Sequence, residues 1–160
     1  MKILLKSAAV TALLLGSGLT QAATTTSSIP MGVDVPRSCT LSNVSAGIIL
    51  PEDGSEAQGA FTLTCNIDGG FNATYSFDSK SNSSKPRVVN ANGVGLETSG
   101  FVEVDGWNLS LDSGSQTLYF LATWLGRPAT AIVKAKLKSP TTATTPAGVY
   151  TDTFRVNVMY

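Results

Sequence analysis

The chain of 160 residues contains two cysteines, and their spacing indicates the chemistry available to them. About 25 residues separate Cys39 from Cys65, whereas redox and zinc sites commonly use a Cys-x-x-Cys motif. An isolated pair in an oxidising compartment is typical of a structural disulfide. Closing a loop of this length stabilises a fold by roughly 3 kcal/mol, because it constrains the unfolded chain. We therefore predict a Cys39–Cys65 disulfide.

Side chains suited to catalysis are scarce. The sequence contains no histidine, so the commonest general base and the commonest metal ligand are missing. Most acidic residues lie in polar segments, and Asp152 is the exception because it shares the parity of apolar residues near the end of the chain. An Asp near the start of a strand often bonds the backbone of a turn, and we expect that role. We predict no enzymatic activity, no metal and no cofactor.

The two tryptophans, Trp107 and Trp124, have side chains that can stack on a sugar ring. Both lie in segments with the apolar pattern of buried strands, so we expect both indole rings in the core. Basic residues form no run, and Lys plus Arg equal Asp plus Glu at 11 each. This composition argues against nucleic acid as a partner.

The first 22 residues have the pattern of a secretory signal peptide. Lys2 and Lys6 precede the apolar stretch AAVTALLL, and small residues follow up to Ala22 and Ala23. We predict cleavage after Ala22. The apolar stretch is too short to span a bilayer and no later one is longer, so we expect a protein that is not embedded in a membrane. The mature chain of about 138 residues is long enough for one domain.

The mature sequence is rich in Thr, Ser, Val, Gly and Asn, which favours an all-β domain. Several segments alternate apolar with polar residues, as strands with one buried face do. The segment 118–125 is apolar on both faces, which is consistent with a central strand or with one covered by a loop. The register of residues 87–106 is not predicted. About seven short strands with turns between them predict an Ig-like β-sandwich. The alternating residues are Phe61, Leu63 and Cys65; Phe71, Ala73, Tyr75 and Phe77; Trp107, Leu109 and Leu111; and Val133, Ala135 and Leu137.

Two further alternating segments lie near the two ends of the mature chain. The segment 29–35 alternates strictly, although it contains a proline and a glycine, which weaken a strand inside a regular sheet. The segment 150–160 alternates up to the last residue, and no later strand is available to pair with it. We expect a detached strand in the first case and an unpartnered edge strand in the second. Their apolar residues are Ile29, Met31, Val33 and Val35; and Tyr150, Phe154, Val156, Val158 and Tyr160.

Each of these two segments lacks a partner strand, and each could supply the partner that the other lacks. A sandwich without its last strand exposes core side chains and unpaired backbone groups, and such an edge aggregates unless something fills it. The leading segment of another copy is a suitable filler, by strand addition. We therefore predict a donor-strand extension at residues 23–37, called the leader below. We predict a domain at residues 38–160 that is an incomplete Ig-like β-sandwich, lacking its last strand and completed by donor-strand exchange.

The ending AGVYTDTFRVNVMY resembles the terminal G-x-Y-x-D-T-x-x-V-x-V-x-aromatic signature of spore coat protein U-type domains, the pilins of archaic chaperone–usher pili. The segments PRSCTL and FTLTCN, which contain the cysteines, are similar to the disulfide arrangement of that family. The resemblance covers residues 29–77 and 146–160 and is poor between 85 and 140. The matching residues of the ending are Gly148, Tyr150, Asp152, Thr153, Val156, Val158 and Tyr160.

The resemblance implies a structural subunit of a bacterial surface pilus, or fimbrium, that mediates adhesion or biofilm formation. It implies other pilin subunits, a periplasmic chaperone and an outer-membrane usher as partners, with export through the periplasm to the cell surface. Two alternatives stay open, a tip or minor adhesin subunit and a self-complete secreted Ig-like binding module. Tip adhesins usually carry a further receptor-binding domain, whereas a self-complete module requires residues 23–35 to fill their own groove.

Overall fold

The computed structural model describes residues 28–79 and 85–160. The chain divides into two units, Met1–Asp34 and Val35–Tyr160, and each is described by itself. The predicted signal peptide at residues 1–22 and the start of the leader, residues 23–27, lie outside the described residues. Among the described residues, no helix is both long and apolar enough to cross a membrane.

The unit Val35–Tyr160 is all-β, as the sequence predicted. Its described part contains nine strands, and all strand pairs between them are antiparallel. The strands are β1 (Cys39–Ser42), β2 (Ala57–Cys65), β3 (Phe71–Phe77), β4 (Arg87–Val89), β5 (Gly95–Val104), β6 (Trp107–Ser110), β7 (Gln116–Phe120), β8 (Ala129–Leu137) and β9 (Phe154–Met159), with a 3-10 helix, η1 (Ala122–Trp124), between β7 and β8.

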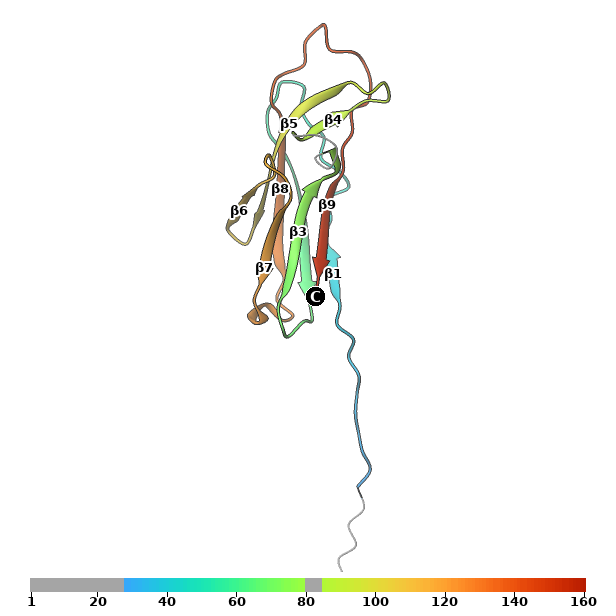
Figure 1. Cartoon of the computed structure of the whole chain (residues 1–160), viewed down its shortest axis with the longest axis vertical. Coiled ribbons are helices and arrows are strands. Elements are labelled where there is room, and N and C mark those ends of the chain that lie inside the picture. The colour runs from blue at the N-terminus through green and yellow to red at the C-terminus, as the bar shows by residue number, and fades with distance from the viewer. Residues whose placement is uncertain (1–27, 80–84) are drawn as a thin grey trace, which may run out of the picture. The chain divides into compact units, whose positions relative to one another are not determined.

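The strands form two sheets that pack against each other (Figure 1). The larger sheet has the order β1-β2-β8-β5-β4, and β6 also pairs with β5. β5 has room for both neighbours because β4 pairs with its first residues and β6 with its last four. The smaller sheet has the order β7-β3-β9. Two antiparallel sheets packed in this way form an Ig-like β-sandwich.

The core lies between the sheets and is built from the alternating faces of their central strands. Every second residue is buried in β8, in β2 from Gly59 onward and in β3 up to Tyr75, and Phe77 is half-buried, which confirms the parity predicted for these three segments. Their intervening Thr, Lys and Gln side chains face solvent, so one face of each sheet stays wet. The largest fully buried side chains include Tyr75, Phe120, Leu63, Ile67, Leu111, Val102 and Val104.

The β5–β6 hairpin places Trp107 outside the core. Asp105 and Gly106 both have positive φ, at 46° and 88°, as a two-residue hairpin turn requires. Trp107 follows this turn directly and is 64% exposed, so the expectation that it packs in the core is wrong. In the part of the chain that the structure describes, β6 pairs with β5 and with no other strand. Leu109 is half-buried and Leu111 is buried, so the predicted parity holds further along the segment.

The alternative of a central strand at 118–125 is wrong. β7 ends at Phe120 and is an edge strand, and η1 follows it. The chain turns here because Gly126 adopts a φ of 66° and donates its N–H to the Cys65 carbonyl at 2.8 Å. Trp124 is half-buried and packs edge-to-face on Phe120, with 5.4 Å between ring centroids, as expected for a core residue.

Candidate functional site

The smaller sheet has an open edge at β9. In the described part of the chain, β9 pairs along its length with β3 and with no other strand. The Asp78 N–H donates to the Thr153 carbonyl at 2.9 Å, which marks a hydrogen-bonded pair just before β9. Since such pairs alternate in an antiparallel ladder, the backbone groups of Phe154, Val156 and Val158 point toward the open edge. These groups are available to another strand.

The strand order identifies the position that is open. In an Ig constant-type sandwich, one sheet has the order A-B-E-D and the other C-F-G. The strands β1-β2-β8-β5 follow the first order, and β3-β9 occupy the positions of C and F. The position of G lies beside β9, and among the described residues no strand fills it.

A hollow of about 960 Å³, called the groove below, opens between the sheets at the end of the sandwich where β9 begins. The six strands β2, β3, β4, β5, β8 and β9 contribute to its walls, together with the loops at 44–52 and 141–153. Most of its side chains are apolar, so the hollow exposes the inside of the sandwich. The apolar wall residues include Ile48, Phe61, Phe77, Val88, Leu96, Val133, Ala135, Leu137, Tyr150 and Phe154.

Phe154, the first residue of β9, is the centre of an aromatic cluster in the groove wall. Its ring packs edge-to-face on Phe77 at 5.7 Å between centroids and lies 6.1 Å from the ring of Phe61. It also stacks on Tyr75 at 6.4 Å. Burial raises the pKa of Tyr75, whose hydroxyl has no hydrogen-bond partner among the described residues. The wall is thus built from rigid rings that define its shape.

A glycine on β5 makes room for the ring of Phe77. A Cβ atom at Gly100 would lie 2.3 Å from Cε2 of Phe77 and 2.6 Å from its Cζ. Real Cβ atoms do not come this close to a ring carbon, so any side chain at position 100 displaces Phe77. The shape of this wall therefore depends on a residue that the sequence pattern did not single out.

The last strand begins at Phe154, four residues later than the alternation from Tyr150 predicted. The Asp152 carboxylate accepts hydrogen bonds from the N–H groups of Ser79 and Thr153, at 2.9 and 2.8 Å. This confirms the expected backbone-bonding role of Asp152. Thr151 forms an isolated bridge with Val89, so the chain changes partner before it joins β3. The side-chain bonds of Asp152 interrupt the ladder, and this interruption delays the strand.

An ion pair holds the outer face of β9. The Arg155 guanidinium donates to the Asp78 carboxylate, with Nη2 at 2.7 Å from Oδ2 and a second bond from Nε to Oδ1. The hydrogen bonds from Arg155 lower the pKa of Asp78 and raise the pKa of Arg155. This pair joins the end of β3 to the start of β9 on the face opposite the core.

The residues predicted to form the acceptor site lie in three environments. Phe154 and Tyr150 line the groove, and the Tyr150 hydroxyl donates to the Pro146 carbonyl at 2.7 Å. Val156 and Val158 are half-buried against the core, further along β9. Tyr160 is exposed. The structure brings these residues to one edge, and their role as an acceptor for another strand stays a prediction.

Most of the groove wall was not predicted from the sequence. Phe61, Phe77 and Leu137 were identified only as core residues, and Ile48 and Leu96 were not identified. No local signal distinguishes a side chain that faces the open side of a core from one buried at its centre. A hairpin signal was present at Asp105–Gly106 and fixes β5 against β6.

The predicted donor residues lie in a segment without helix or strand. The side chains of Ile29, Met31 and Val33 are 86%, 95% and 88% exposed, and Val35 is 67% exposed. Exposed apolar side chains at strand spacing are able to enter a sheet as a group. Their role as a donor stays a prediction.

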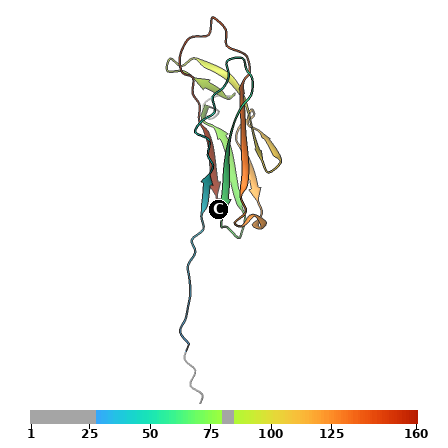
Figure 2. The ribbon, with the colours of Figure 1, turned by 180° about the vertical axis from the view of Figure 1, so that it is seen from behind.

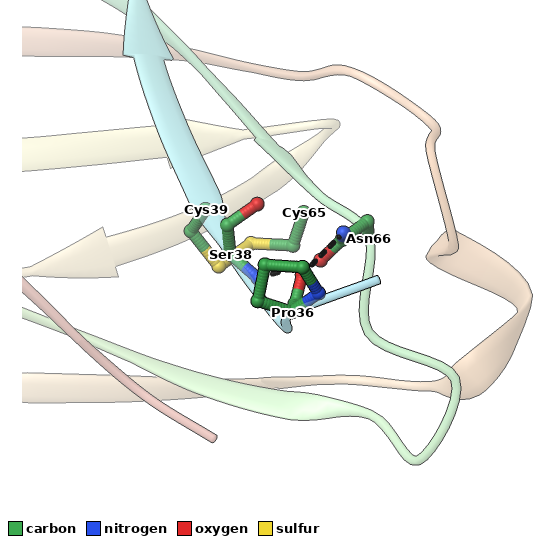
Figure 3. The surroundings of a disulfide bond; sticks show 5 residues. All are labelled: Pro36, Ser38, Cys39, Cys65 and Asn66. Atoms are coloured by element: carbon green, nitrogen blue, oxygen red, sulfur yellow. Dashed lines mark hydrogen bonds between the residues drawn. A yellow bond between two sulfur atoms is a disulfide. The ribbon is translucent and has the colours of Figure 1, made fainter. Parts of the chain in front are cut away.

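The predicted disulfide is confirmed between Cys39 and Cys65 (Figure 3). These residues face each other in the register of β1 and β2, so the bond joins two neighbouring strands of the larger sheet. A disulfide on the core face of a sandwich is able to bridge the two sheets, but this one stays within a single sheet. The residue after Cys65 is Asn66, whose side chain bonds the backbone of Pro36 and Ser38.

No group of three or more His, Cys, Asp and Glu side chains able to hold a metal ion occurs within residues 28–79 and 85–160.

No family model matches this chain, and no curated protein matches it. Solved structures from fimbrial and chaperone–usher systems are similar to it. One is a chain from a chaperone–tip adhesin complex of CFA/I fimbriae biogenesis, with 15% identity, a TM-score of 0.46, and coverage of 75% of this chain and 40% of that one.

Another is from the CsuC–CsuE chaperone–tip adhesion subunit complex of the archaic chaperone–usher Csu pili of Acinetobacter baumannii, with 15% identity, a TM-score of 0.45 and coverage of 79% and 40%. A third is CfaE, the adhesive subunit of CFA/I fimbria of enterotoxigenic Escherichia coli, with 14% identity, a TM-score of 0.36 and coverage of 72% and 43%. The chain thus spans less than half the length of these structures.

Proposed function

We propose that this chain is a structural subunit of a bacterial surface pilus, and that a β-segment from another chain completes its sandwich. One observation carries the proposal. The open edge of β9 lies beside a groove that exposes core side chains between the two sheets. A soluble sandwich with this opening is an aggregation hazard unless a partner covers it.

The opening has the features that strand addition requires. Edge-facing backbone groups of β9 provide hydrogen bonds, and the apolar groove beside them accepts alternate side chains. The leader offers four aliphatic side chains at strand spacing, Ile29, Met31, Val33 and Val35. Burying each contributes roughly 1.5–3 kcal/mol, so four contribute about 6–12 kcal/mol before the cost of ordering the leader.

The leader and the groove are different surfaces, so each copy can donate to one neighbour and accept from another. Such head-to-tail contacts do not close and therefore make a fibre. We propose export through the periplasm to the cell surface, with a periplasmic chaperone that occupies the groove before assembly and an outer-membrane usher that exchanges the chaperone for the next leader. The spore coat protein U-type resemblance supports the archaic class of such pili and a role in adhesion or biofilm formation.

The proposed work of this chain is structural, without an enzymatic step. The proposed boundaries are a signal peptide at 1–22, the leader at 23–37 and the sandwich at 38–160.

Deletion of residues 23–35 from the mature chain tests the proposal. We expect a domain that aggregates when refolded alone and becomes soluble with a synthetic peptide of residues 23–37. A peptide with the same composition in scrambled order is the matched control. A soluble truncated monomer that is indifferent to the peptide would favour the self-complete module instead.

A single substitution in the leader tests donation separately. Val33→Asp places a charge where the donor side chain is buried, so we expect loss of polymerisation. Binding of the chaperone is expected to remain, because the chaperone contacts the groove and not the leader. Normal polymerisation of Val33→Asp subunits would show that this residue is not a donor side chain.

A further inference from the structure

Asn66 fixes the backbone at the junction between the leader and β1. Its Nδ2 donates to the Pro36 carbonyl at 2.9 Å, and its Oδ1 accepts from the Ser38 N–H at 2.6 Å (Figure 3). Its backbone N–H donates to the Ser38 carbonyl at 3.0 Å. We call these three bonds the Asn66 clamp. They continue the β1–β2 ladder beyond the Cys39–Cys65 pair, with an amide side chain in place of backbone groups.

The clamp holds residues 36–38 extended. Proline fixes φ at Pro36 and disfavours helical backbone at the preceding residue, Val35. The chain therefore cannot reverse direction at residues 35–38 while the clamp is closed. Any reversal must take place earlier, within the leader.

The clamp and the groove lie at different ends of the sandwich. Cys39 faces Cys65 at the end of β2, and the end of β9 pairs with Asn72 a few residues further along the chain. β1 and the end of β9 therefore share one end of the unit, where Figures 1 and 2 show them side by side. The groove is lined at the other end of the unit, by Phe154 at the start of β9, Phe77 at the end of β3 and Leu137 at the end of β8.

Because of this separation, the length of the leader decides whether it is able to reach the groove of its own chain. The six residues of β9 span about 20 Å at 3.3 Å per residue. A leader that turned back into its own groove would have to cover that length. A reversal consumes about 2–5 residues. If residues 36–38 are clamped, the turn must be formed by residues near Val33 and Val35. The side chains of these two residues then cannot enter the groove of the same chain. Ile29 is then too close to the turn to reach Phe154 at the other end of β9.

We propose that the Asn66 clamp prevents the leader from completing its own sandwich and so directs it to a second copy of this chain. The inference rests on the proposed function, because it assigns to Asn66 the choice between self-completion and strand donation. Asn66 is a positioning residue, which acts through the backbone of Pro36 and Ser38. Without the side-chain bonds of Asn66, residues 36 and 37 are free to turn, and the leader then reaches the groove of its own sandwich.

The test compares the mature wild-type chain with Asn66→Ala, which keeps the backbone bond of the clamp and removes both side-chain bonds. Each chain is refolded at micromolar concentration with a fluorescent peptide of residues 23–37, and binding and polymerisation are measured. A leader in its own groove competes at an effective concentration of about 1 mM, so we expect at least about tenfold weaker peptide binding by Asn66→Ala. We also expect slower polymerisation and more monomer.

The matched control is Asp68→Ala. Asp68 forms an exposed ion pair with Arg37 at 3.3 Å, beside the clamp. Exposed pairs of this kind contribute little to stability, so peptide binding and polymerisation should equal those of the wild type.

A second variant keeps the test decisive if Asn66→Ala fails to fold. Insertion of Gly-Ser-Gly-Ser between Val35 and Pro36 leaves the clamp intact and supplies the residues for a reversal. We expect it to weaken peptide binding and slow polymerisation in the same way.

Each outcome has a distinct meaning. If the wild type binds the peptide and both variants bind it equally well, the clamp is overturned and strand donation stands. If only the insertion weakens binding while a folded Asn66→Ala chain matches the wild type, the role of Asn66 is overturned. If the wild-type chain and the 23–35 deletion both fail to bind the peptide, strand donation fails and the clamp fails with it.

Discussion

The ring of Phe77 occupies the space that a side chain at Gly100 would fill. Phe77 is the last residue of β3, and its ring crosses toward β5, where Gly100 pairs with Ala135. The ring then meets Phe154 at the start of β9. One glycine thereby sets the position of two aromatic residues that line the groove.

Substitution Gly100→Ala should destabilise the peptide-completed chain by about 1–3 kcal/mol, the usual cost of overpacking a core. The same change should weaken binding of the leader peptide, because Phe77 must move in the groove wall. Urea unfolding and peptide titration measure the two effects. Gly69→Ala is the control, since no atom lies within 4 Å of a Cβ at that position and Gly69 does not line the groove. Equal stability of the two variants would contradict the packing argument.

The ion pair between Asp78 and Arg155 makes the stability of the folded chain depend on pH. The hydrogen bonds from Arg155 lower the pKa of Asp78 in the folded chain below its ordinary value. A carboxylate with a lowered folded pKa contributes stability above its unfolded pKa, about 3.9, and loses it as pH falls through the folded pKa. The pair therefore stabilises the folded chain at neutral pH and not in strong acid.

Asp78→Asn should be less stable than the wild type at neutral pH, and the difference in unfolding free energy should shrink as pH falls below about 4. Urea unfolding of the peptide-completed chains at several pH values measures this difference. Arg155→Gln removes the same pair from the other side and should behave alike. A difference that does not change with pH would show that Asp78 acts through something other than its charge.

At the scale of elements, β9 is a strand with two different edges. One edge carries the ladder to β3, and the other carries the backbone groups of Phe154, Val156 and Val158. The two edges alternate along the strand, so neighbouring residues serve different partners. This alternation allows the edges to be tested one at a time.

Val156→Pro should remove an N–H that faces the open edge and leave the hydrogen bonds to β3 in place, since edge strands tolerate proline. We expect a folded chain with native circular dichroism that binds the leader peptide at least about tenfold more weakly, a loss of about 1.4 kcal/mol. Asn157→Pro removes an N–H that donates toward β3, so we expect this variant to lose the cooperative unfolding transition. If the two substitutions had equal effects, the assignment of the two edges would be wrong.

At the scale of the whole molecule, the proposed function makes completion of the sandwich a binding equilibrium coupled to folding. The domain exposes core side chains in the groove, and on this proposal a strand that fills it binds the folded form alone. The stability of a subunit would then be inseparable from the concentration and affinity of its donor. In the proposed fibre a subunit has its donor permanently in place, whereas a free subunit would depend on the proposed chaperone.

Stability should therefore rise with peptide concentration. At a free concentration one hundred times the dissociation constant, the leader peptide should add about 2.7 kcal/mol to the free energy of unfolding of the 23–35 deletion variant. Thermal unfolding over a series of peptide concentrations measures this rise. A Val33→Asp peptide is the control and should add little. A midpoint independent of leader-peptide concentration would exclude binding at a folding-coupled site.

Local patterns in the sequence were enough to predict several strands and the disulfide. Alternation identified the buried faces of β2, β3 and β8 because side-chain direction in a strand depends only on parity. The cysteine pair was equally clear, since no other thiol competes with it. The role of Asp152 followed from its place near a strand start.

Other features depend on which strands are neighbours, and parity carries no such information. Trp107 has the parity of a core residue and is exposed, because β6 is short and follows a tight turn. The segment at 118–125 is apolar on both faces, yet its strand stops at Phe120 at the edge of the smaller sheet. The segment from Tyr150 alternates, but Asp152 delays the strand to Phe154.

The sequence by itself determined that the chain forms half-buried strands, joins Cys39 to Cys65, and carries an exposed apolar segment of strand spacing. Tertiary structure alone decided that Phe61, Phe77, Leu137 and Phe154 meet in one groove, and that Asn66 holds the junction before β1. The physical reason is the distance along the chain over which each interaction acts. Parity and propensity act between residues a few positions apart, whereas a groove and a clamp depend on contacts between segments distant in the chain, which form only when the sheets pair.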